Sequence, residues 1–139
     1  MARINRTAPA GTDTLSSDEA RRIAIAAQAF APSRERPLLA LKPGGKGDVT
    51  STHVLWSFNN GPDVPTPVSD GTYLYSINDR GILYCLDAKT GKTVSGPQRL
   101  RNATYSDSAV LADGKIYLTD EDGVASVIQA GPKYVLLAE

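Results

Sequence analysis

The sequence predicts an all-β protein with one α-helix appended near its N-terminus. Across most of residues 38–139, apolar and polar side chains alternate with the period typical of short strands. Gly, Pro, Asp and Asn punctuate the gaps. A turn, strand, turn order opens at Asp70 and returns about 43 positions later at Asp113. Because a period of roughly 40 to 50 residues built from short strands is typical of propeller blades, we expect a partial β-propeller of about two four-stranded antiparallel blades.

The composition is that of a globular chain without a strong charge. Of its 139 residues 41% are hydrophobic, and 15 Lys and Arg balance 15 Asp and Glu. A neutral chain has no overall field that attracts nucleic acid or an anionic membrane, so both partners are disfavoured. No stretch of about 20 apolar residues could cross a bilayer. Arg21 and Arg22 interrupt the only candidate signal peptide, so we expect the chain as written to be cytoplasmic.

Three segments of different composition precede the strands. Residues 1–14 are polar and small, and we expect them to form a flexible tail. Residues 15–31 are predicted to form an amphipathic helix, because Ser16 and Glu19 have the spacing of a capping box. Apolar residues recur along one side of this helix: Ala20, Ile23, Ala27 and Phe30. Residues 32–37 form a charged linker that ends at Pro37.

The predicted helix resembles a known DNA-binding element. Residues 15–24 and 27–30 are similar to the opening helix of the winged-helix family that includes bacterial crosslink-repair DNA glycosylases. This resemblance implies a DNA-binding or repair-related role as one alternative function. The family's winged helices and catalytic residues have no counterpart downstream, so we transfer no activity. The other interpretation is a capped helix that docks on the sheet that follows.

The strand candidates are short and are joined by turns. They are Leu38–Leu41, Val54–Phe58, Thr72–Ile77, Ile82–Leu86, Ser108–Leu111, Lys115–Thr119, Val124–Ile128 and Tyr134–Leu137. Three of them run into a Gly-containing turn with a lysine, and each turn feeds an outer strand: Val54–Phe58, Thr93–Val94 and Tyr134–Leu137. The Asp-Gly pairs make the tight reversals that let twisted strands pair side by side.

One turn resembles a specific repeat family. The segment Leu86–Lys92 reads Leu-Asp-Ala-Lys-Thr-Gly-Lys, which is similar to the turn of the pyrroloquinoline-quinone-type (PQQ-like) β-propeller repeat. In that family a tryptophan follows three residues later, where this chain has Ser95, whereas Trp56 is similar to the docking residue of the preceding blade. The resemblance covers about residues 38–139. Most such repeats bind no quinone and serve as scaffolds, and related full-length propellers are often periplasmic or exported.

The chain is too short to close such a ring. A ring of roughly four blades at about 42 residues each needs about 170 residues. The sequence supplies about two blades and the end of a third, and an open arc leaves apolar blade faces uncovered. We therefore expect a fragment, a fusion of two gene pieces, or a subunit that completes its blade stack by self-association or with a protein partner.

The sequence predicts no catalytic, cofactor-binding or metal-binding residue and no enzymatic activity. Cys85 is the only cysteine and is expected to act as a small hydrophobe. The related quinone-dependent dehydrogenases need an adjacent cysteine pair and calcium-binding carboxylates, so a quinone-dependent oxidoreductase fragment is the weaker alternative. Large aromatic side chains are expected to pack between blades or to contact a partner: Trp56, Tyr73, Tyr75, Tyr84, Tyr117 and Tyr134.

Three polar motifs each have a second interpretation. Thr90–Thr93 is similar to the end of a phosphate-binding loop, but no helix follows, so a turn is preferred. The carboxylates of Asp120–Asp122 could bind a hard cation, although a hairpin turn ending at Gly123 explains them. His53 is expected to be a partly exposed strand residue.

Overall fold

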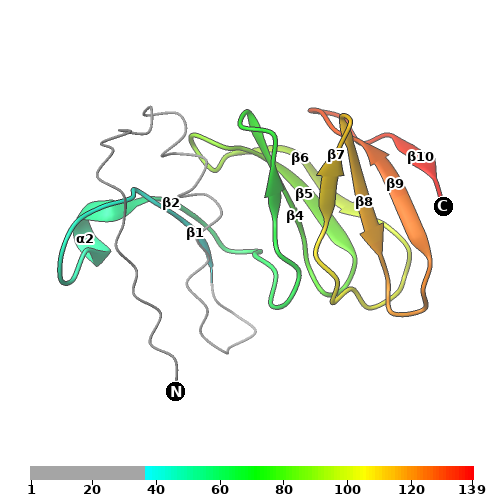
Figure 1. The fold of residues 1–139 in the computed structure, drawn as a ribbon, viewed down its shortest axis with the longest axis horizontal. Coiled ribbons are helices and arrows are strands. Elements are labelled where there is room, and N and C mark those ends of the chain that lie inside the picture. Colours follow the sequence, from blue (N-terminus) through cyan, green and yellow to red (C-terminus); the bar gives the residue numbers. More distant parts are fainter. Residues whose placement is uncertain (1–36) are drawn as a thin grey trace, which may run out of the picture.

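The computed structural model describes residues 37–139, which form three antiparallel sheets that follow one another in chain order (Figure 1). The N-terminal ribbon pairs β1 (Leu38–Leu41) with β2 (Val54–Phe58). The middle sheet contains β3 (Val68–Ser69), β4 (Tyr73–Ile77), β5 (Ile82–Asp87) and β6 (Thr93–Arg99). The C-terminal sheet contains β7 (Val110–Ala112), β8 (Lys115–Thr119), β9 (Ala125–Gln129) and β10 (Leu136–Ala138).

The predicted all-β character is confirmed for the described residues. Both four-stranded sheets are meanders, because each strand pairs with its neighbours in sequence. The only helix in this range is α2 (Thr50–His53), a single turn before β2. Within residues 37–139 the sheets do not close on themselves. The tail, helix and linker predicted over residues 1–36 lie outside the described residues.

Three local features differ from the prediction. Strand β6 runs for seven residues to Arg99, although only its first two were expected, because Pro97 is tolerated on an edge strand that need not donate every backbone hydrogen bond. Strand β3 has two residues, too few for an alternation to be recognised. His53 ends α2 rather than lying in a strand, because its amide donates to the carbonyl of Val49 at 2.9 Å.

Two tight hairpins open the four-stranded sheets with different turn chemistry. Asp113 and Gly114 between β7 and β8 have φ angles of 48° and 65°, the pattern of a type I′ turn. Between β3 and β4, Gly71 has a φ of 90° at the first central position, as in a type II′ turn. The Asp-Gly pair therefore lies one position earlier in the first hairpin than in the second.

Equivalent hydrogen bonds recur in the middle and C-terminal sheets at positions 42 residues apart in the sequence. Ala88 donates its amide to the carbonyl of Thr72 at 3.0 Å, and 42 positions later Ala130 donates to Gly114 at 2.9 Å. The turns from β4 to β5 and from β8 to β9 correspond in the same way. The side chain of Asn78 accepts the amide of Ile82 at 3.0 Å, and that of Asp120 accepts the amide of Val124 at 2.9 Å.

The middle sheet is covered on both faces. One apolar cluster lies between it and the N-terminal ribbon: Leu38, Ala40, Trp56, Leu74 and Leu86. A larger cluster lies between the middle and C-terminal sheets: Tyr75, Ile77, Leu83, Cys85, Tyr105, Ala109, Ile116, Leu118 and Ile128. Because side chains alternate along a strand, the neighbours Leu74 and Tyr75 serve opposite clusters. No helix of the described residues is long and apolar enough to span a membrane.

Candidate functional site

Trp56 docks the N-terminal ribbon on the middle sheet. Its indole Nε1 donates a hydrogen bond to the carbonyl of Ala88 at 3.1 Å, and only 9% of the residue is exposed. The ring lies against Gly91, where a Cβ atom would come within 2.5 Å of Cδ2 of Trp56. The β5–β6 turn therefore needs glycine at this position to accept the ring.

The β5–β6 turn is organised by one carboxylate. Oδ1 of Asp87 accepts hydrogen bonds from the amides of Lys89 and Thr90 at 3.0 and 2.8 Å, and from the Thr90 hydroxyl at 2.8 Å. The hydrogen bond from the Thr90 side chain is the main cause that lowers the pKa of Asp87. The segment then enters β6 at Thr93, so a strand and not a helix follows the turn, as predicted.

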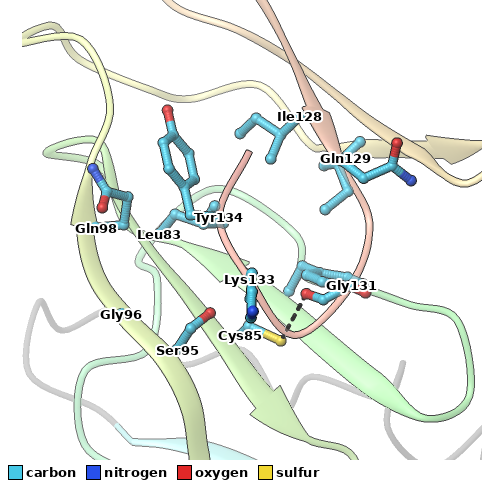
Figure 2. A pocket seen from close by; sticks show the side chains of 12 residues that line it. Leu83, Cys85, Ser95, Gly96, Gln98, Ile128, Gln129, Gly131, Lys133 and Tyr134 are labelled. Carbon is cyan, nitrogen blue, oxygen red and sulfur yellow. Dashed lines mark hydrogen bonds between the residues drawn. The ribbon is translucent and has the colours of Figure 1, made fainter. Parts of the chain in front are cut away.

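In the middle sheet, the position that corresponds to Trp56 is Ser95, which has no aromatic ring. Ser95 pairs with Cys85 across β5 and β6, as Trp56 pairs with Ala40 across β1 and β2. A narrow crevice lies beside Ser95 between the middle and C-terminal sheets (Figure 2). Its wall includes Gly131, whose carbonyl accepts a hydrogen bond from the Cys85 thiol at 3.6 Å.

Burial acts on two ionisable side chains that line this crevice, Cys85 and Tyr75. Burial raises the pKa of the Cys85 thiol to about 11. Burial and the hydrogen bond that Tyr75 donates to Oδ2 of Asp70 at 2.8 Å raise the pKa of the Tyr75 hydroxyl.

The outer face of the C-terminal sheet carries exposed apolar side chains. Three apolar side chains pair across its neighbouring strands: Val110, Tyr117 and Val127. Val110 is 58% exposed, Tyr117 is 39% exposed, and Val127 is half-buried. We call these three residues the outer triad.

The outer triad has a buried counterpart in the middle sheet. The residues 42 positions earlier pair in the same order across β3, β4 and β5: Val68, Tyr75 and Cys85. Tyr75 and Cys85 are only 3% and 4% exposed, because the C-terminal sheet covers them. The outer triad thus occupies register positions that are covered one sheet earlier. At the far end of the face, Thr119 and Ala125 take the places of the larger apolar residues Ile77 and Leu83.

Of the six aromatic residues predicted to pack between blades or to contact a partner, five are buried or partly buried and one is exposed. Trp56 and Tyr75 are buried in the two clusters. Tyr84 packs edge-on against Phe58 with ring centroids 5.0 Å apart. Tyr73 and Tyr134 are partly buried against the larger cluster. Tyr117, in the outer triad, is the exposed member.

Tyr105 is a core residue that the sequence analysis missed. It is 1% exposed, and its ring contacts Gly81, where a Cβ atom would lie 2.7 Å from Cε2 of Tyr105. Its amide donates to the carbonyl of Asp79 at 3.0 Å, which ties the β6–β7 connection to the middle sheet. Tyr105 lies outside every strand, so no alternation marks it; its bulk in a polar segment was the one available signal.

The acidic loop of the C-terminal sheet is partnered by arginine. Arg101 binds Asp120 at 2.8 Å and Asp122 at 3.2 Å. Burial disfavours the charged form of Asp120, but hydrogen bonds from Val124 and Arg101 outweigh it and lower its pKa. The loop therefore forms a hairpin turn closed by an ion pair. Across residues 37–139, no three His, Cys, Asp or Glu side chains are grouped to hold a metal ion.

No protein-family model matches the chain, and no curated protein matches it.

Proposed function

We propose that this chain is a non-enzymatic scaffold or protein-interaction module, built from about two PQQ-like propeller blades and the end of a third. The observation that supports it best is the covered middle sheet, with the ribbon docked on one face through Trp56 and the C-terminal sheet on the other. The 42-residue correspondence between the four-stranded sheets also supports successive blades.

The proposal places function on the sheet faces rather than in a cleft. Two four-stranded sheets and a ribbon are fewer than the roughly four blades of the smallest ring. We therefore infer that the stack is a segment of a larger assembly and that its uncovered faces bind further sheets. Stacked repeats depend on their neighbours for stability, so binding and folding are coupled in this scheme.

Light scattering after size-exclusion chromatography tests whether the chain is a scaffold. A stable scaffold is expected to elute as a discrete species, either monomer or defined oligomer. Soluble aggregate of broad mass would contradict the proposal, because it would indicate sheets that cannot hold together outside a longer chain.

Two assays separate this proposal from its alternatives. Reconstitution with pyrroloquinoline quinone and calcium, followed by a dye-reduction assay, is expected to give no turnover; turnover would favour the quinone-dependent oxidoreductase. Fluorescence anisotropy with duplex DNA at two salt concentrations is expected to show no binding. Salt-sensitive binding would instead favour a DNA-binding role for the N-terminal segment.

A further inference from the structure

A polar hollow of about 340 Å³ lies beside the β4–β5 turn. Asp79 and Arg80 of this turn form part of its lining, and Arg99 and residues 102–104 form the rest. The hollow is separate from the crevice beside Ser95, because the two share no lining residue. Its size falls within the range of about 300–1,000 Å³ that is typical of small-molecule sites. The hollow therefore has room for a small ligand.

Main-chain hydrogen bonds tie the two parts of this lining together. Leu100 donates its amide to the carbonyl of Gly81 at 2.9 Å, and Tyr105 donates its amide to the carbonyl of Asp79 at 3.0 Å. The segment between these two bonds is therefore tethered at both ends to the β4–β5 turn. Tyr105 is also buried in the larger apolar cluster, so one end of the segment is fixed in the core. A ligand meets a lining that is already ordered, which lowers the cost of binding.

Two arginines bring positive charge to the hollow. Nη1 of Arg99 donates a hydrogen bond to the carbonyl of Arg80 at 3.0 Å, which holds the Arg99 guanidinium against the turn. In the part of the chain that the structure describes, neither arginine forms an ion pair with a carboxylate. The neighbouring Arg101 differs, because it is paired with Asp120 and Asp122.

The one carboxylate in the lining is engaged by the main chain. Oδ1 of Asp79 accepts the amide of Val64 at 3.0 Å, and Oδ2 accepts the amide of Asp63 at 3.3 Å. Two guanidinium groups and a single carboxylate leave the lining positive. The side chains of Asn102 and Thr104 add neutral hydrogen-bond donors. A positive lining rich in donors favours an anion with several acceptor oxygens.

We propose that the hollow binds a small phosphate monoester, with its phosphate group held by Arg80 and Arg99. Guanidinium groups offer planar pairs of N–H donors that match phosphate oxygens, and these charge-assisted hydrogen bonds are among the stronger ones. Since a water molecule takes about 30 Å³ in the liquid, the hollow has room for more than a bare phosphate ion. The organic group of the ester then lies beside Asn102 and Thr104.

A small ligand fits this site better than a nucleic acid does. The positive charge is confined to one hollow, and the chain as a whole has a net charge of zero, whereas nucleic-acid binding needs an extended basic surface. Both arginines are exposed, so binding is expected to weaken as salt is added. This ligand site goes beyond the scaffold role and does not depend on it.

NMR titration of the full chain with glycerol 3-phosphate tests the proposal. Saturable shifts are expected at the amides of residues 102–104 and at the side-chain N–H groups of Arg80 and Arg99. Glycerol, which lacks the phosphate group, is expected to leave these signals in place. Inorganic phosphate is expected to shift the same signals but to bind more weakly, because it makes no contact beside Asn102.

Charge-removing substitutions and a matched control locate the binding. Arg80→Gln and Arg99→Gln each remove one guanidinium, and each is expected to weaken the binding of glycerol 3-phosphate about tenfold. Lys89→Gln removes the same charge from an exposed residue of the β5–β6 turn, at the other end of β5, and is expected to bind like the parent chain. Because Arg99 also bonds to the turn, Arg80→Gln tests the charge alone. Emission from Trp56 reports whether each variant keeps its fold.

Four results would overturn the inference. They are the absence of saturable shifts at the hollow, glutamine variants that bind like the parent chain, inorganic phosphate that binds as tightly as the ester, and duplex DNA that displaces the ester. The scaffold proposal has its own test in the light-scattering profile, so failure of one proposal can be told apart from failure of the other.

Discussion

At the scale of the residue, Gly91 decides whether the ribbon can dock. Its φ of 70° disfavours any side chain, and its missing Cβ leaves room for the ring of Trp56. Gly123 has a similar φ of 83° but no atom within 4 Å of the Cβ position. A side chain at Gly123 would cause backbone strain alone, whereas a side chain at Gly91 would also clash with Trp56. Comparing substitutions at the two glycines therefore distinguishes the two effects.

We predict that Gly91→Ala destabilises the chain more than Gly123→Ala does. Both variants pay roughly 1–2 kcal/mol for a left-handed alanine, and only Gly91→Ala also pushes on the indole. Urea denaturation gives the two free energies of unfolding, and Trp56 emission is expected to shift to longer wavelength in Gly91→Ala alone. Equal losses in the two variants would mean that the ring moves aside without cost.

Cys85 gives a second prediction at this scale. The residue is 4% exposed and burial raises the pKa of its thiol to about 11, so little thiolate is present near pH 8. We expect a disulfide reagent such as DTNB to react far more slowly with the folded chain than with the chain in urea. Because Cys85 is the only cysteine, the whole signal belongs to it. Fast labelling of the folded chain would show that the middle and C-terminal sheets separate readily.

At the scale of the element, the β5–β6 turn gives stability a dependence on acid pH. The pKa of Asp87 is lower in the folded chain than its ordinary value near 4, chiefly through Thr90. The contribution of Asp87 is therefore complete above about pH 4 and is lost as the pH falls through the lower folded pKa. We predict that Asp87→Asn destabilises the chain at pH 7, and that this difference shrinks below about pH 4. Denaturation at several pH values measures it, and a difference that persists unchanged in acid would contradict it.

Two kinds of element can be predicted from the sequence. They are strands whose apolar and polar side chains alternate, and turns that require residues such as Asp and Gly. Strands such as β4 and β5 alternate because each face meets a different apolar cluster. Strand β6 was underestimated because Gly96 and Pro97 resemble the end of a strand, although an edge strand tolerates both. Tyr105 was missed because its burial depends on a connection folding back over Gly81, which no local pattern records.

The candidate site is harder to predict from sequence than the strands are. Tyr75 and Tyr117 occupy the same kind of alternating segment, and nothing local distinguishes them. Their exposures of 3% and 39% differ because one face has a neighbouring sheet and the other has none within the described residues. Exposure of the outer triad is thus a property of the number of stacked sheets.

At the scale of the whole molecule, the chain contains an internal comparison of a covered and an uncovered face. Tyr75 and Tyr117 are the same residue type at positions 42 apart, with corresponding partners on the neighbouring strands. They differ in the sheet that follows, in the hydrogen bond from Tyr75 to Asp70, and in one strand partner, which is Cys85 for Tyr75 and Val127 for Tyr117. Their substitutions therefore measure what one more sheet contributes to stability.

We predict that Tyr75→Ala costs about 3–5 kcal/mol and that Tyr117→Ala costs less than about 1 kcal/mol in dilute solution. Tyr75→Phe removes only the hydrogen bond to Asp70, so it separates that bond from the packing of the ring. Urea denaturation at low protein concentration gives all three values. A cost at Tyr117 that equals the cost at Tyr75 in dilute solution would contradict the view that this face lacks a neighbouring sheet.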